Sequence, residues 1–195
     1  MMKYLALGDS YTIGEQVDAA LNFPNQLVKL STSNPNPVVL DKLIAVTGWT
    51  TDELAIAIEK ERPSFDYDLV TLLIGVNNQY RGRSMDEYAW QFYSLLCQSI
   101  LFVNAEPQNV IVLSIPDWGL TPFNTERDKD LTSKEIDAFN AINKKTTLEL
   151  GCRYIDITRS TRIHAEDLSF LAEDRLHYSG KEYRLWAEKI NSLIR

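Results

Sequence analysis

Short apolar segments rich in Val, Ile and Leu alternate along this chain with longer segments of helical periodicity. The apolar segments show no regular polar alternation, which is typical of strands buried on both faces of a parallel sheet. Five repeats of a strand followed by a helix, joined by right-handed crossovers, predict an α/β fold: a three-layer α/β/α sandwich around a five-stranded parallel, flavodoxin-like sheet. The predicted strands cover residues 3–8, 38–46, 67–75, 109–115 and 152–158.

Local signals mark where the helices begin and end. In a capping box, a hydroxyl residue and a glutamate three positions later satisfy each other's backbone N–H groups at a helix start. Pro24 is typical of a first helical turn, and Gly151 of the position after a helix. No shift in composition divides the chain, so we predict a single domain over residues 1–195. The four capping-box pairs are Thr50 with Glu53, Ser84 with Glu87, Thr132 with Glu135, and Ser179 with Glu182.

The net negative charge of the chain argues against some classes of binding partner. The 195 residues include 20 Lys and Arg against 27 Asp and Glu, which gives a net charge of −7. Nucleic acids and anionic membranes repel such a charge, so we expect no nucleic-acid partner. Apolar runs fall far short of the roughly 20 residues of a membrane span, so we expect no stable membrane insertion.

The cellular location is predicted from the N-terminal segment and the cysteines. The segment MMKYLALGDS is too short for the core of a signal peptide with its cleavage site, and it is better interpreted as a first buried strand. Cys97 and Cys152 lie in apolar surroundings, with no C-x-x-C motif and no neighbouring histidine. This pattern favours reduced, structural thiols and a cytoplasmic protein.

Several cofactor motifs are missing from the sequence. Neither G-x-x-x-x-G-K-[ST] nor G-x-G-x-x-G follows a predicted strand, so the phosphate-binding turns of ATP and dinucleotide sites are lacking. No His, Cys, Asp and Glu cluster has zinc-ligand spacing, and the G-x-S-x-G elbow of α/β-hydrolases is missing. We therefore expect no metal and no organic cofactor.

Small and polar residues follow the predicted strands. Ligands of parallel α/β sheets bind at the carboxyl ends of the strands, near the point where strand order reverses. We therefore expect the candidate site to be built from these segments. They are Gly8-Asp9-Ser10, Thr47-Gly48-Trp49, Gly75-Val76-Asn77-Asn78 and Pro116-Asp117-Trp118.

Ser10, His177 and Asp174 are candidates for nucleophilic catalysis. The only histidines are His164 and His177. Asp174, three residues before His177, can accept a bond from Nδ1–H and leave Nε2 facing a nucleophile such as Ser10. His164, in the segment RIHAED, is interpreted as a surface histidine near a helix start. Taken one at a time, Ser10 and the D-x-x-H pair are equally compatible with structural roles.

Taken together, four ordered blocks resemble the SGNH (GDSL) hydrolase family of lipases and esterases. The resemblance covers nearly the whole chain and implies the SGNH hydrolase fold. It implies that Ser10 is the nucleophile, His177 the base and Asp174 its orienting partner. It also implies an oxyanion hole made by the backbone N–H groups of Ser10 and Gly48 and the side-chain amide of Asn77. The blocks are Gly8-Asp9-Ser10-Tyr11, Val46-Thr47-Gly48-Trp49-Thr50-Thr51, Gly75-Val76-Asn77-Asn78 and Asp174-x-x-His177.

Three positions depart from the family pattern. Tyr11 replaces the Leu of G-D-S-L at a position that we expect to tolerate change, and Asn78 stands where the family usually has Asp. Trp49 follows the oxyanion glycine where a polar residue is common, which predicts a more apolar pocket. We expect Trp49, Trp118 and Phe123 to contact the substrate.

The resemblance implies a serine ester hydrolase that cleaves small to medium acyl esters through an acyl-serine intermediate, without a cofactor. The expected partner is a small-molecule ester, and the oligomeric state stays open. Within the family, a carbohydrate O-deacetylase, a lysophospholipase and a thioesterase are alternatives. A flavodoxin-like binding domain with a vestigial catalytic set is the alternative from another class.

Overall fold

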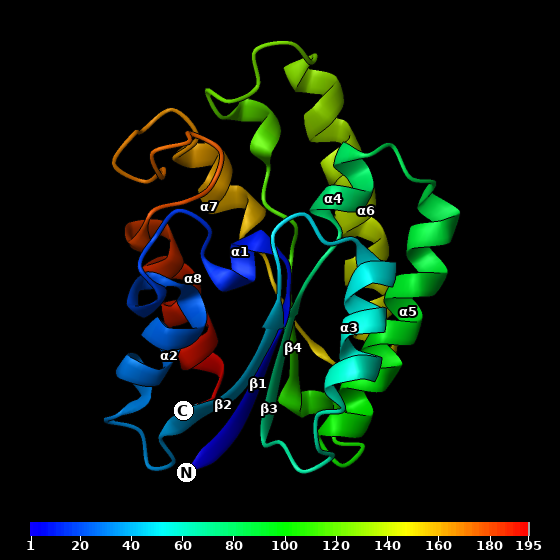
Figure 1. Cartoon of the computed structure of the whole chain (residues 1–195), viewed down its shortest axis with the longest axis vertical. Coiled ribbons are helices and arrows are strands. Elements are labelled where there is room, and N and C mark those ends of the chain that lie inside the picture. The colour runs from blue at the N-terminus through cyan, green and yellow to red at the C-terminus, as the bar shows by residue number, and fades with distance from the viewer. Residues whose placement is uncertain (195) are drawn as a thin grey trace.

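The computed structural model describes residues 1–194 and has a five-stranded, all-parallel sheet with the strand order β2-β1-β3-β4-β5 (Figure 1). The predicted fold class is confirmed, because every predicted strand is present and all strands pair in parallel. The strands are β1 (Met2–Gly8), β2 (Val38–Ala45), β3 (Leu69–Leu73), β4 (Val110–Leu113) and β5 (Arg153–Ile155).

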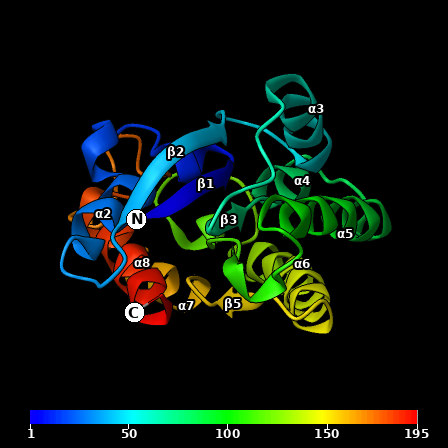
Figure 2. The same ribbon diagram turned by 90° about the horizontal axis from the view of Figure 1, so that it is seen from below.

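Helices cover both faces of the sheet. Helices α2, α7 and α8 lie on one side, and α3, α5 and α6 lie on the other (Figures 1 and 2). The helices are α1 (Ser10–Ile13), α2 (Phe23–Ser31), α3 (Thr51–Glu61), α4 (Val76–Tyr80), α5 (Met85–Phe102), α6 (Lys129–Glu149), α7 (Thr158–Ile163) and α8 (Gly180–Leu193), with short 3₁₀ turns η1 (Ala19–Leu21), η2 (Pro107–Asn109) and η3 (Trp118–Leu120). Within the described chain, no helix has both the length and the apolar character to cross a membrane.

Most of the predicted helix starts are close to the observed ones. The backbone N–H of Thr50 donates to Glu53 at 2.8 Å, as the capping box requires, and Ser84 and Ser179 cap α5 and α8. The prediction of a start at Thr132 is wrong. Helix α6 begins at Lys129, because Asp128 accepts the N–H of Leu131 and acts as the N-cap.

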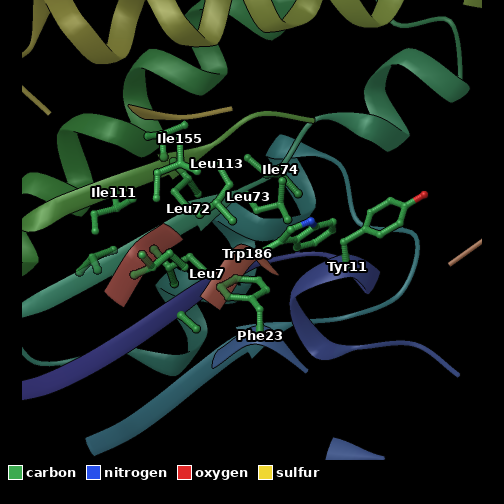
Figure 3. Packing of buried hydrophobic residues seen from close by; sticks show 14 of the residues in the cluster. Leu7, Tyr11, Phe23, Leu72, Leu73, Ile74, Ile111, Leu113, Ile155 and Trp186 are labelled. Atoms are coloured by element: carbon green, nitrogen blue, oxygen red, sulfur yellow. The ribbon is translucent and has the colours of Figure 1, made fainter. Parts of the chain in front are cut away.

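The core lies on both faces of the three central strands. All residues of β3 and β4 are buried, whereas β2 is an edge strand with several exposed or half-exposed positions. The expectation of burial on both faces is therefore wrong for β2. Figure 3 shows Leu7, Leu72 and Trp186 within the packed cluster, with Tyr11 at its edge. This core fixes the carboxyl ends of β1 and β3, from which the candidate site is built.

Candidate active site

The strand order reverses between β1 and β3, and the predicted site residues gather at the carboxyl ends of these strands. Ser10 follows β1, and Asn77 follows β3. A loop between α7 and α8 brings Asp174 and His177 to the same edge of the sheet. Residues separated by more than 160 positions therefore lie around one cavity, as expected for a doubly wound sheet.

A tight turn presents Ser10. Asp9 is the N-cap of α1, and its Oδ1 accepts the N–H of Tyr11 at 3.0 Å. The turn requires glycine at position 8, because a Cβ there would lie 2.1 Å from Thr12 Oγ1 and 2.5 Å from the carbonyl oxygen of Leu73. The close packing of β1, α1 and β3 at Gly8 thus places Ser10 at the first position of the short helix α1.

The carboxyl group of Asp9 is buried beneath this turn. Burial raises the pKa of Asp9 from 3.8 to about 7, and the hydrogen bond from the N–H of Tyr11 opposes this only in part. The second carboxyl oxygen, Oδ2, is buried without a hydrogen-bond partner in the described structure. Both observations indicate that the neutral acid fits this position better than the carboxylate.

Asp9→Asn should make the unfolding free energy less dependent on pH. The folded-state pKa of Asp9 lies above its unfolded value, so its contribution to stability is complete below about pH 4 and is lost as pH rises to about 7. The asparagine variant should therefore gain on the order of 2–4 kcal/mol relative to the wild type over this window. Urea unfolding at several pH values measures the difference. A difference that stays constant from pH 4 to pH 8 would show that Asp9 does not titrate in this range.

Asp174 and His177 form a hydrogen-bonded pair. The Nδ1–H of His177 donates to Asp174 Oδ2 at 2.6 Å, and Asp174 Oδ1 accepts the N–H groups of Leu176 and His177 at 3.0 and 2.9 Å. Partial burial raises the pKa of Asp174, but the hydrogen bonds from the His177 ring and these N–H groups outweigh burial and lower it overall. The carboxylate thus stays ionised and holds the imidazole with Nε2 available to other groups.

Ser10, Asn77 and His177 line one small cavity of about 180 Å³. The described structure contains no hydrogen bond between Ser10 Oγ and His177 Nε2, a bond that is often long or poorly aligned without substrate. A larger cavity of about 380 Å³ lies near Ser114 and Asp156, but it is lined by neither histidine. The lining of the smaller cavity is completed by Tyr11, Val76, Tyr80, Trp118, Phe123 and Leu176.

The predicted oxyanion donors besides Ser10 are Gly48, which follows β2, and Asn77, which follows β3. The Nδ2 of Asn77 donates one N–H to the carbonyl oxygen of Trp49 at 3.0 Å, which fixes the amide and leaves its second N–H for another acceptor. Gly48 has a φ of +85°, and its carbonyl oxygen accepts from Arg81 at 2.6 Å. Gly48 and Trp49 lie outside the lining of the 180 Å³ cavity in the described part of the chain.

Asn77→Ala and Asn78→Ala should have different effects. Asn78 is fully buried and exchanges two hydrogen bonds with Thr51, so its loss should reduce stability more than kcat. Loss of the predicted oxyanion donor at Asn77 should lower kcat about 10²–10³-fold and change KM only a few-fold. Steady-state kinetics on both variants test this. The assignment fails if Asn78→Ala has the lower kcat, or if Asn77→Ala changes KM alone.

Two of the three predicted pocket aromatics line the cavity. Trp118 is buried, and its Nε1–H donates to Gln79 Oε1 at 2.8 Å. The rings of Tyr80 and Phe123 contact Trp118 edge-on, with centroids 5.2 and 6.3 Å away. Trp49 instead packs against the hydrophobic core.

The sequence analysis missed four lining residues. Tyr11, Val76 and Leu176 each lie next to a predicted site residue in the sequence, and Tyr80 lies three positions after Asn77. Their position beside Ser10, Asn77 and His177 is a signal that could have identified them.

His164 is half-buried, with 22% of its side chain exposed, and it lies at the end of α7 and not near a helix start as expected. Its Nδ1 pairs at 2.7 Å with Glu182, a fully buried carboxylate that also accepts from Ser160 and from the Nε1–H of Trp186. The imidazole stacks on Phe170 with a centroid distance of 3.8 Å. Glu182 therefore joins α7 to α8 and does not complete the predicted capping box, and His164 lies outside the cavity that contains Ser10.

Comparisons with known proteins agree with the fold and identify the family. Residues 6–185 match the model of the GDSL-like lipase/acylhydrolase family. None of the curated proteins matches the sequence.

Solved structures resemble this chain over nearly its full length. The lipase/acylhydrolase from Enterococcus faecalis has a TM-score of 0.75 at 20% identity, covering 100% of this chain and 95% of that one. An acetyl xylan esterase has a TM-score of 0.77 at 19% identity, covering 100% of both chains. The psychrotrophic esterase from Pseudoalteromonas sp. has a TM-score of 0.71 at 13% identity, covering 100% of this chain and 97% of that one. At these identities, the likeness supports the fold and not the substrate.

Proposed function

The chain belongs to the GDSL-like lipase/acylhydrolase family, and from this membership we propose that it is a serine ester hydrolase with Ser10, His177 and Asp174 as its catalytic triad. The observation that carries the proposal is the Asp174–His177 pair, whose imidazole lines the same cavity as Ser10. A hydroxyl, a base and a carboxylate that orients the base are the groups that acyl transfer requires.

In the proposed acylation step, Ser10 Oγ attacks the ester carbonyl carbon while its proton passes to His177 Nε2. The N–H groups of Ser10, Gly48 and Asn77 stabilise the oxyanion of the tetrahedral intermediate. The intermediate collapses when the protonated imidazole gives its proton to the leaving alcohol, which breaks the C–O bond. In deacylation, a water molecule attacks the acyl carbon while His177 takes the water proton. The bond between the acyl carbon and Ser10 Oγ then breaks as His177 returns the proton to Oγ, and the carboxylic acid is released.

The size of the cavity favours a short acyl group. A volume of about 180 Å³ is below the roughly 300–1,000 Å³ of most ligand pockets, and Trp118 and Phe123 form one wall. Trp118 is fixed by its bond to Gln79, so the wall cannot easily withdraw. We therefore propose esters of small acids, acetate above all, as substrates. Acetylated carbohydrates are a second candidate, because an acetyl xylan esterase is among the similar structures.

A panel of p-nitrophenyl esters of graded chain length tests the proposal. We expect kcat/KM to be highest for the acetyl to butyryl esters and to fall at least about tenfold by the octanoyl ester, because additional methylenes do not fit the pocket. Phe123 is partly exposed at the cavity, so Phe123→Ala should move the preference toward longer chains. Acetylated sugars and acyl-CoA esters, run in parallel, distinguish the other family activities. Absence of turnover on every ester would favour the vestigial binding domain.

A further inference from the structure

Tyr11 connects the two proposed catalytic residues. It follows Ser10 directly in α1, and its ring lies 5.2 Å from the His177 imidazole, centroid to centroid, at an interplanar angle of 52°. The Tyr11 ring also packs against Tyr178, at a centroid distance of 5.7 Å. Figure 3 shows Tyr11 at the edge of the core, with its hydroxyl directed away from the packed cluster. The residue after the nucleophile thus packs against the base, which is 166 positions further along the chain.

The contact is shielded from solvent. Tyr11 is 2% exposed and His177 is 7% exposed. Burial raises the pKa of Tyr11 well above 10, so the phenol is neutral and its ring keeps an electron-rich face. Such a face attracts a cation within about 6 Å, and the attraction is stronger where water is excluded. The leucine of the G-D-S-L pattern would fill similar space without providing this face.

In the proposed mechanism, His177 is neutral when the substrate binds. It becomes an imidazolium when it takes the proton of Ser10, and again when it takes a proton from water. Asp174 faces the His177 ring at Nδ1, and the ring of Tyr11, which is neutral, packs beside it. The centroid distance of 5.2 Å between Tyr11 and His177 is within this range of about 6 Å, so the Tyr11 ring favours the charged form of His177 that exists during each chemical step.

We infer that Tyr11 is a positioning residue whose ring stabilises the imidazolium of His177, an inference that rests on the proposed function. Because the charge is absent in the ground state, the ring should act on kcat and leave KM nearly unchanged. A space-filling role makes a different prediction, since it depends on the shape of the side chain and not on the electron density of the ring.

Fluorinated phenylalanines at position 11 separate the two roles. Tyr11→Phe is the reference of the series, because it keeps an electron-rich ring without the hydroxyl. Stepwise fluorination withdraws electron density from the ring with little change in shape. Between phenylalanine and its trifluoro derivative, kcat should fall in steps to a total of about 5- to 20-fold. KM should change less than twofold. A kcat that is constant across the series would overturn the inference.

Two further variants complete the experiment. Tyr11→Leu should show the same loss of kcat, and the fluorinated series decides the question if this variant does not fold. Tyr67→Leu is the matched control, because Tyr67 is also buried but precedes β3 at the other end of the sheet. It should lose stability and keep kcat. If Ser10→Ala stays active, the proposed function fails; if Ser10→Ala is inactive and fluorination has no effect, only the role of Tyr11 fails.

Discussion

Ser10→Ala should reduce kcat for ester hydrolysis by a factor of about 10⁴–10⁶, the loss expected when the nucleophile of a triad is removed. The fold should be nearly unaffected, because the described structure gives the Ser10 hydroxyl no hydrogen-bond partner whose loss would destabilise the protein. Steady-state kinetics with a p-nitrophenyl ester and thermal unfolding of the same preparation measure both effects. Activity above about a tenth of the wild-type value would exclude the serine mechanism.

Ser94→Ala is the control for this experiment. The Ser94 hydroxyl is on the exposed side of α5 and donates to the carbonyl oxygen of Trp90, away from the cavity. Its removal should change neither kcat nor KM. A comparable loss in this variant would point to a general effect of serine replacement or of preparation.

His177→Ala should cause a loss of kcat similar to that of Ser10→Ala, because a nucleophile and its base act as a unit. His164→Ala should retain most activity but unfold at a lower temperature. It leaves the buried Glu182 without its histidine partner and removes the stacking on Phe170, at a cost of about 1–3 kcal/mol. Steady-state kinetics and thermal unfolding of the His177→Ala and His164→Ala variants, measured in parallel, test this prediction. An inactive His164 variant beside an active His177 variant would reverse the assignment of the base.

The fold was predictable because its signals are local. Uninterrupted apolar segments such as β3 and β4 identify strands, and the alternation with helices identifies a parallel sheet. The edge position of β2 depends on strand order, which arises from long-range packing that periodicity does not contain. The start of α6 was missed because Asp128 lies in the charged segment 125–130, which has no apolar periodicity, while Thr132 and Glu135 matched a motif by spacing alone.

The site was predictable where its contacts are short in sequence. Asp174 and His177 are three residues apart, so a turn suffices to join them. The proximity of Ser10 to His177 depended on the family resemblance, since no local pattern relates positions so far apart. The pairing of His164 with Glu182 and the packing of Tyr11 on His177 are likewise tertiary contacts. Trp49 was expected in the pocket from its neighbour Gly48, but its ring packs on the core.

The most direct test of the central claim is the reaction of the folded protein with a fluorophosphonate, followed by peptide mass spectrometry. Fluorophosphonates phosphonylate a serine that an adjacent base activates. We expect one adduct per chain, located on Ser10, absent in Ser10→Ala and formed much more slowly in His177→Ala. No adduct on the folded protein, or an adduct on another residue that persists in Ser10→Ala, would contradict the assignment of Ser10 as the nucleophile.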